Sequence, residues 1–144
     1  MEAQDNCAQN GGHLPEPRNE SENNLLDGLT STSVMFYLGM TDKMTEGNWT
    51  WETDGTSVTW TNWMMYGAEA EPDGGEAENC AVMLSQGGRE KVETGKWGDR
   101  PCTGEDVILV CEAKAGKSNW CIDMCIDQGL LNTGRDHGLL STGR

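Results

Sequence analysis

The chain has 144 residues, of which 24 are acidic and 10 are basic, so its formal net charge at pH 7 is -14. This length suffices for one domain with a hydrophobic core. Nucleic acids and anionic membranes both require a positive protein surface, so the charge argues against both as partners. The sequence has no run of about eighteen apolar residues, which argues against insertion into a membrane.

The beginning of the chain predicts two short helices. Residues 2–9 (EAQDNCAQ) read as a helix that the following NGG ends. HLPEP is a connector, and residues 19–29 combine a capping residue, early acids and then leucines, as a second helix would. Met1 falls where the first helix is already under way, and no secretory signal is present. We therefore expect the sequence to lack the true N-terminus of the protein.

Short strands are predicted after the helices. Residues 34–40 form an apolar, β-prone run, and residues 47–63 alternate tryptophan with polar residues around Asp-Gly, as a hairpin does. Residues 80–84 and 107–112 are candidates for buried strands, and 89–106 read as a long polar loop around one tryptophan. Two helices followed by several short strands predict an α+β fold.

The composition changes near residue 114. Residues 1–113 hold 21 of the 24 acidic residues, whereas the remainder is nearly neutral. The sequence DQGLLNTGR (127–135) is followed by the similar DHGLLSTGR (136–144). Two units of nine residues are too little for a solenoid. We interpret 114–144 as a flexible, repeat-containing tail outside the domain, or as a recent tandem duplication without function.

An acidic loop is the most unusual segment of the chain. Residues 69–80, EAEPDGGEAENC, hold five carboxylates together with a proline and two glycines. Like charges repel, so this loop is either simply solvated or meant to hold a cation. Ca²⁺ takes six to eight oxygen ligands, often from carboxylates, so such a loop suits it.

The six cysteines favour an oxidising compartment, because a small chain with this many suggests a disulfide framework. We therefore expect a secreted, extracellular protein. Glycosylation patterns at Asn19 and Asn48 give this weak support and predict a glycoprotein. No pattern of an enzyme is present: His13 and His137 are remote from each other, and no catalytic triad order, nucleotide loop or zinc spacing occurs. The chain is accordingly predicted not to be an enzyme.

Several motifs in a fixed order resemble the C-type lectin-like domain. They cover roughly residues 2–113 and are a strand motif (YLGM, 37–40), a tryptophan hairpin (EGNWTWETDG, 46–55), the tripeptides EPD (71–73) and WGD (97–99), and four framework cysteines. The resemblance implies two helices with small antiparallel sheets and a long calcium-binding loop region. The first strand of the family fold is missing here, so residues 1–113 would be a domain whose last strand has an exposed edge.

The resemblance also implies the disulfides. Cys7 would pair with Cys111 and Cys80 with Cys102, each bond stabilising by roughly 2–4 kcal/mol. Cys121 and Cys125 have no place in that framework. A bond between them, a link to another chain that would give a disulfide-linked oligomer, and two idle thiols all remain open.

The family's principal Ca²⁺ site maps onto the acidic loop and the WGD motif. Pro72 would be cis, and Gly98 stands where the family has an asparagine ligand. The matching positions that would hold Ca²⁺ and contact the sugar are Glu71, Asp73, Glu78 and Asp99. An accessory ion would use Asp42 and Glu46, with Glu76 replacing the acid that is Gly74 here, although Asp42 and Glu46 could equally cap the turn before the hairpin.

The expected function is calcium-dependent binding of carbohydrate by an extracellular module. In the family, each sugar hydroxyl on the ion accepts a hydrogen bond from an amide ligand and donates one to an acid. Asp73 and Gly98 replace both amides, and an ionised carboxylate cannot donate, so weak or altered sugar binding is expected. The alternative is a protein- or mineral-binding domain of the same fold, with or without calcium. The tryptophans between residues 49 and 97 are expected in the core rather than at the ligand.

Overall fold

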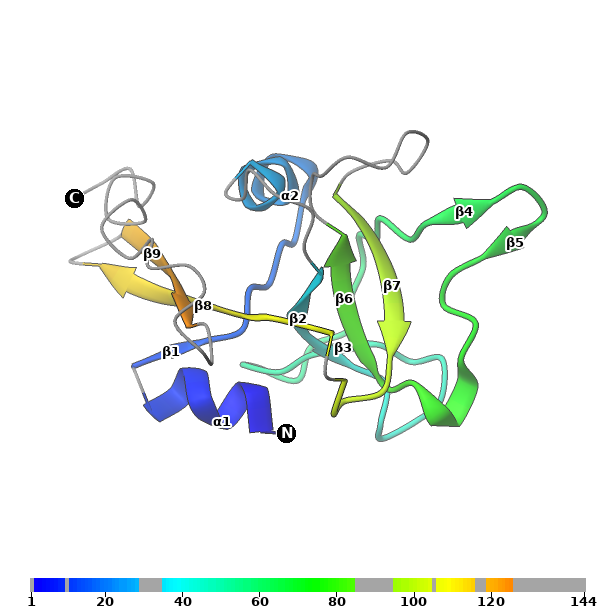
Figure 1. Ribbon diagram of the computed structural model, residues 1–144, viewed down its shortest axis with the longest axis horizontal. Coiled ribbons are helices and arrows are strands. Elements are labelled where there is room, and N and C mark those ends of the chain that lie inside the picture. Colours follow the sequence, from blue (N-terminus) through cyan, green and yellow to red (C-terminus); the bar gives the residue numbers. More distant parts are fainter. Residues whose placement is uncertain are drawn as a thin grey trace.

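A computed structural model describes residues 2–9, 11–28, 35–84, 95–104, 106–115 and 119–125 (Figure 1). The central element is a four-stranded antiparallel sheet in the order β3-β2-β6-β7. Its strands are β2 (Met35–Thr41), β3 (Thr50–Trp51), β6 (Cys80–Leu84) and β7 (Lys96–Arg100). Two helices and two further small antiparallel sheets complete the fold, which confirms the predicted α+β class.

Both faces of the central sheet are buried. Successive side chains of a strand point to opposite faces, and the strand β2 is apolar at nearly every position. Phe36, Leu38 and Met40 belong to the larger core, which includes Trp97 and Leu26, and all five are at most 1% exposed. A second, smaller core lies on the other face. Tyr37 of β2 and Val82 of β6 belong to it, together with residues from the rest of the fold: Ala3, Cys7, Leu14, Cys80 and Cys111.

The two helices pack into different cores, and in Figure 1 α2 lies at the top of the view and α1 at the bottom. Helix α1 (Glu2–Gln9) contributes Cys7 to the smaller core, and α2 (Glu20–Asp27) contributes Leu26 to the larger one. The predicted cap of the second helix is present, because the Asn19 side chain accepts a hydrogen bond of 2.9 Å from the Glu22 N–H. None of the described helices is long and apolar enough to cross a membrane.

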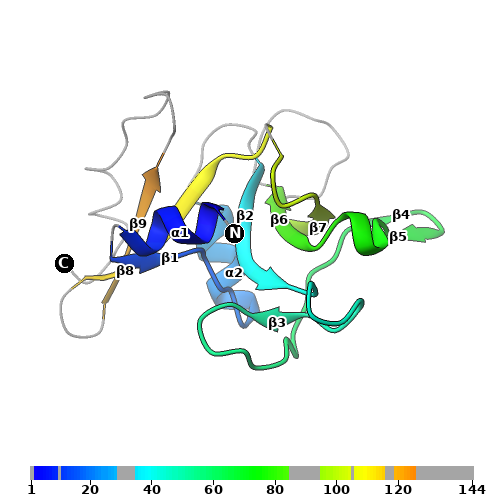
Figure 2. The same ribbon diagram turned by 90° about the horizontal axis from the view of Figure 1, so that it is seen from below.

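A second sheet lies beside α1 and has the order β1-β8-β9 (Figure 2). Strand β8 (Leu109–Ala115) pairs with the two-residue β1 (Gly12–His13) on one side and with β9 (Asn119–Cys125) on the other. The expected exposed edge of the last strand is therefore wrong for this structure, because β9 pairs with β8 from Leu109 to Ala115. The remaining residues of 114–144, including the tandem repeat, lie outside the described residues, and their assignment to a separate tail stays a prediction.

Two strand assignments need correction. The segment 89–106 was predicted to be a loop, but its residues 96–100 form β7, which pairs with the whole of β6. The segment 47–63 was predicted to be a hairpin around Asp-Gly, and an antiparallel turn does form there, but it is shorter than predicted. Thr50 bridges to Ser57, the Val58 N–H donates to the Trp49 carbonyl, and the regular strand is limited to Thr50–Trp51. The irregular remainder of that segment supplies tryptophans to the larger core.

A long loop region leaves the sheet between β3 and β6. It contains the hairpin β4 (Met65–Tyr66) and β5 (Glu69–Ala70) and the 3₁₀ helix η1 (Gly75–Ala77). In both ribbon views the β4–β5 hairpin and η1 lie at the end of the molecule opposite β8 and β9 (Figures 1 and 2). Disulfides join Cys7 to Cys111 and Cys80 to Cys102, as the family resemblance implied. The second bond ties the start of β6 to the segment that follows β7.

Candidate functional site

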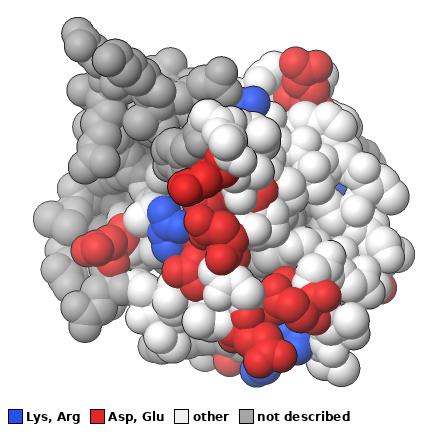
Figure 3. All heavy atoms as spheres, turned by 90° about the vertical axis from the view of Figure 1, so that its right-hand side faces the viewer, with Lys and Arg blue, Asp and Glu red and all other residues white. Residues whose placement is uncertain are grey.

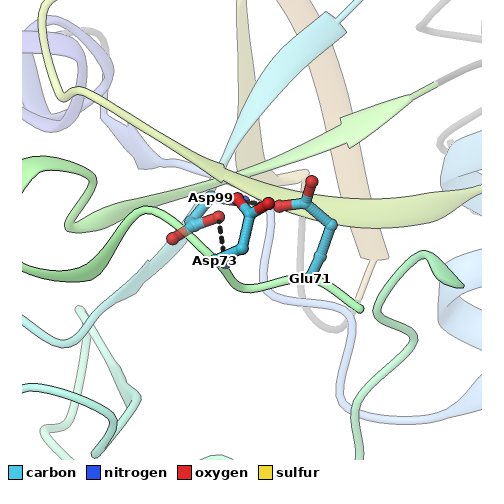
Figure 4. Close-up of side chains that lie close together, drawn as sticks. All are labelled: Glu71, Asp73 and Asp99. Atoms are coloured by element: carbon cyan, nitrogen blue, oxygen red, sulfur yellow. Dashed lines mark hydrogen bonds between the residues drawn. The ribbon is translucent and has the colours of Figure 1, made fainter. Parts of the chain in front are cut away.

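Three of the predicted ligand residues converge where the long loop region meets β7. Glu71, Asp73 and Asp99 each place a carboxylate oxygen within 4.8 Å of the others (Figure 4). Glu71 and Asp99 are buried, whereas Asp73 is exposed. The Glu71–Pro72 peptide bond is cis, as the resemblance implied. Two buried acids and a third at the surface thus offer carboxylate oxygens as ligands. Oxygen ligands of this type are those that Ca²⁺ prefers.

Asp99 holds this arrangement together. It is 1% exposed and lies in β7, paired with Ala81 of β6. Its two carboxylate oxygens accept hydrogen bonds from the backbone N–H groups of Asp73, at 3.0 Å, and Gly74, at 2.8 Å. Its own N–H donates to Glu71 Oε2 at 3.2 Å. A carboxylate has about four acceptor positions, so Asp99 keeps capacity for a cation while it fixes the loop.

Glu78 reaches the same place from the far side of η1. The 3₁₀ turn brings its side chain back onto Gly74, so closely that a Cβ at Gly74 would collide with the Glu78 side chain. Burial, together with repulsion from Asp99 and Asp73, raises the pKa of Glu78, while the positive charge of Arg100 opposes this. Glu78 is therefore a neighbour of the three converging acids but not part of their closest group. Gly74 is needed here for space.

The backbone of Met64 fixes the approach of the loop to the site. The Met64 carbonyl accepts a hydrogen bond from the Glu71 N–H at 2.9 Å, and its N–H donates to the Trp97 carbonyl at 2.8 Å. Glu71 is thereby connected through Met64 to the strand that carries Asp99. The sequence motifs did not indicate this link, because it uses only backbone atoms.

Arg100 is the residue near the site that sequence reasoning missed. It follows Asp99 in β7 and is half-buried, and its Nη1 donates to the Asp99 carbonyl at 2.6 Å. The family motif ends at Asp99, so it gave no reason to include the next residue. The available signal was spacing, because residues 98 and 100 share a face of a strand.

The crowding of the acids raises the pKa of Glu71. Burial, a hydrogen bond with Asp99 and the negative charges of Asp73 and Asp99 raise the pKa of Glu71 to about 7. The N–H of Asp99 opposes this rise by donating to the carboxylate. Near neutral pH and without a cation, Glu71 is thus about half protonated, and a bound cation would favour its charged form.

The raised pKa of Glu71 predicts how pH affects the metal-free domain. An unfolded glutamate ionises near 4.5, so between about pH 4.5 and 7 the unfolded state loses a proton that the folded state keeps. The contribution of Glu71 to stability is therefore expected to fall as pH rises through this window and to stay constant above it. Urea unfolding in a chelator at pH 5.5 and pH 8 measures the change, and Glu71→Gln should reduce it. An identical pH dependence in the variant would contradict the prediction.

The two acids predicted for an accessory ion also lie close together. Asp42 is 2% exposed, and its Oδ2 accepts a hydrogen bond of 2.9 Å from the Gly47 N–H. Its Oδ1 is buried without a hydrogen-bond partner among the described residues. Partial desolvation and the charges of Asp42, Glu76 and Asp99 raise the pKa of the exposed Glu46. The hydrogen bond to Gly47 fits the turn-capping role, whereas the unpartnered Oδ1 is what a cation would satisfy.

The surroundings of these acids are acidic at the surface and aromatic in the core. Acidic side chains gather on the face that carries the long loop region, with few lysines or arginines between them (Figure 3). Trp49, Trp51 and Trp97 are at most 7% exposed, and Trp60 and Trp63 pack against the same core. The expectation that these tryptophans are core residues is confirmed.

Cys121 and Cys125 lie in β9, in register with Ala113 and Leu109, and their linkage stays a prediction.

Comparison with protein families and curated proteins gives a consistent result. A family model described as the lectin C-type domain matches residues 1–113. The chain is 34% identical to a mannose-binding protein of Gallus gallus, covering 74% of this chain and 37% of that protein. It is 40% identical to pulmonary surfactant-associated protein D of Sus scrofa, covering 78% and 27% respectively. The chain therefore spans only about a third of the length of these curated relatives.

Solved structures include both sugar-binding and other proteins of this fold. The mouse scavenger receptor C-type lectin carbohydrate-recognition domain has a TM-score of 0.58 and 25% identity, covering 72% of this chain and 73% of that one. The herring type II antifreeze protein has a TM-score of 0.54 and 31% identity, covering 71% and 72%. The fold is thus shared with proteins of different named activities.

Proposed function

The chain belongs to the C-type lectin domain family, and from this premise we propose that it is an extracellular, calcium-dependent carbohydrate-binding module. The observation that carries the proposal is the convergence of Glu71, Asp73 and Asp99 on one point. Named relatives that are a mannose-binding protein and a carbohydrate-recognition domain support the ligand class. The role is binding without catalysis.

Four acids would hold the principal ion. Asp99 and Glu71 would supply buried carboxylates from β7 and the loop, Asp73 an exposed one, and Glu78 would close the site from above Gly74. Asp42 and Glu46 would hold an accessory ion. Ca²⁺ would neutralise the charges of the crowded acids. It would also offer free coordination positions to two hydroxyls of the ligand. These hydroxyls would donate hydrogen bonds to the carboxylates.

A titration of Ca²⁺ tests this function. Calorimetry on the full chain, with both disulfides intact, should detect binding that Asp99→Ala abolishes and that Glu71→Gln weakens by at least about tenfold, since each removes a charged oxygen ligand. Asp54→Ala is the control, because Asp54 is an acid that pairs with Arg18 instead. Mannose, galactose and fucose are then titrated into the loaded protein. Absence of Ca²⁺ binding would overturn the proposal.

The alternative of a protein- or mineral-binding domain has one observation in its favour. Met44 is 89% exposed between Asp42 and Glu46, and Met65 is 65% exposed in the hairpin that precedes Glu71. Exposed methionines beside acids give a mixed surface, and neighbours in the fold include antifreeze proteins. Ca²⁺ binding without any response to the three sugars would favour this alternative.

A further inference from the structure

Two cysteines are left over when the framework disulfides have formed. The chain has six cysteines, and four of them make up the two disulfides of the fold. The other two, Cys121 and Cys125, both lie in strand β9. In an oxidising compartment, which the six cysteines favour, leftover cysteines suggest bonds to another chain.

The pairing of β9 rules out a bond between Cys121 and Cys125. Strand β9 pairs with β8 at every residue from Asn119 to Cys125, so its backbone is extended throughout. Four residue steps along a strand separate the two Cα atoms by about 13 Å. A disulfide requires a Cα–Cα distance of about 4.4–6.8 Å. Because the other cysteines are already paired, these two need a partner in another molecule.

Strand β9 has the features of an edge that can receive another strand. It is the outer strand of the sheet β1-β8-β9, so β8 is its only partner among the described strands (Figure 2). Proteins protect such edges with proline, lysine or a bulge. The sequence of β9, NWCIDMC, has no proline or lysine, and its register with β8 is regular. Asp123 is the one charged residue in it.

The sequence of β9 fits pairing with a second copy of itself. Two identical antiparallel strands are related by a two-fold axis, and an axis at residue 123 sets residue 121 opposite residue 125 of the other strand. Opposite Cα atoms of antiparallel strands are about 4.5 or 5.5 Å apart, which suits a disulfide in either case. Ile122 and Met124, on the other face of the strand by alternation, become apolar cross-strand neighbours in the same register.

We propose that β9 is a dimer interface, in which two copies of this chain pair antiparallel through this strand and Cys121 of each bonds to the partner's Cys125. Each bond takes two electrons and two protons from a pair of thiols, and a small disulfide such as oxidised glutathione accepts them and becomes two thiols. The dimer does not depend on carbohydrate binding, because β9 lies at the end of the molecule opposite η1 and the β4–β5 hairpin (Figure 1).

The full chain in a glutathione redox buffer provides the test, measured by intact mass and by electrophoresis without reductant. The wild type should form a dimer with two interchain disulfides, and peptide mapping should find Cys121 joined to Cys125. Cys121→Ser and Cys125→Ser should each give no covalent dimer, because the remaining cysteine lies about 13 Å along the strand from its copy. A wild type that stays monomeric with two free thiols would overturn the proposal.

A mixture of the two single variants tests the register. Cys121→Ser and Cys125→Ser together should give a covalent heterodimer with one disulfide, because one complementary pair of cysteines still lies opposite. An isotope label on one variant tells the two chains apart by mass. A covalent homodimer of either variant, or no heterodimer in the mixture, would show that this register is wrong. The double variant Cys121→Ser/Cys125→Ser is the control, and a covalent dimer of it would place the link at other cysteines.

Asp123→Asn measures the position of the two-fold axis independently. In the proposed register Asp123 lies opposite its own copy, and like charges directly opposite each other are unfavourable. The variant should therefore raise the monomer–dimer equilibrium constant in the redox buffer by about two- to fivefold. Glu69→Gln is the matched control, since it removes an exposed charge from β5 at the other end of the molecule. No rise in Asp123→Asn, or an equal rise in both variants, would contradict an axis at Asp123.

Discussion

Replacing Trp97 with alanine is expected to lower the free energy of unfolding by about 3–5 kcal/mol, the range for truncating a large buried aromatic residue. Trp97 is fully buried and makes edge-on contacts with Trp51, Trp60 and Trp63, with ring centroids 6.5, 5.5 and 5.7 Å away. Its Nε1–H donates to Asn23 Oδ1 at 2.7 Å, so the variant also leaves a buried acceptor without its donor.

The same substitution should weaken Ca²⁺ binding, although Trp97 is no ligand. It lies two residues before Asp99 in β7, and its backbone accepts the Met64 N–H that fixes the loop. Urea unfolding followed by tryptophan fluorescence measures stability, and calorimetry measures Ca²⁺ affinity. Trp97→Phe is the matched control, because it keeps a buried aromatic ring while it loses the Nε1–H donor and one ring of the indole. Equal stability of the alanine and phenylalanine variants would contradict the packing argument.

Loss of the Cys7–Cys111 disulfide is the second large effect. The bond spans a sequence separation of 104 residues, and the chain-entropy relation gives a stabilisation of about 4–5 kcal/mol for such a loop. It also ties the eight-residue α1 to β8, and a helix this short is not stable alone. The double variant Cys7→Ser/Cys111→Ser should therefore lose about 4 kcal/mol in urea unfolding and expose α1 to proteolysis.

The second disulfide provides the comparison. Cys80–Cys102 spans a separation of only 22 residues, so its removal should cost less stability, about 3 kcal/mol. Because Cys80 is in register with Arg100 at the end of β7, this loss should instead reduce Ca²⁺ affinity more strongly. If the two double variants showed the reverse order in stability, the loop-entropy argument would be wrong.

The elements that the sequence predicted well are those with a strong local signal. The cap at Asn19 and the apolar run in β2 led to the second helix and the first long strand within one or two residues. Strand β6 was predicted at 80–84, the bounds it has in the structure. In each case the residue pattern of the segment itself agrees with its burial in the fold.

Strand β7 lacks such a signal, and β9 was hidden by its place in the chain. In β7, KWGDR offers a single apolar residue among polar ones, and Trp97 alone faces the larger core. Asp99 is buried because the acidic loop folds over it and donates two hydrogen bonds, which is a tertiary effect. Strand β9, NWCIDMC, lies beyond the composition change near residue 114 and next to the repeats, so it was assigned to the tail, although it pairs with β8 along its whole length.

Knowledge of the site came from resemblance more than from local pattern. Glu71 and Asp99 are separated by 28 positions, and composition alone does not indicate that these two acids meet. The motifs carried that information, and they ended at Asp99. Arg100 was missed because the motif ends at Asp99, and only the three-dimensional arrangement shows that its Nη1 lies against the Asp99 carbonyl, at 2.6 Å.

The placement of β9 has a practical consequence for displaying the protein. Strand β9 lies at one end of the molecule, and the β4–β5 hairpin and η1 of the long loop region lie at the other (Figure 1). A bead or chip attached through a cysteine near β9 would therefore hold the molecule with its acidic face toward the solution. Immobilisation through random lysines gives no such orientation. Molecules tethered in this way would all present the acidic site to a glycan array. Weak single contacts could then add up through avidity.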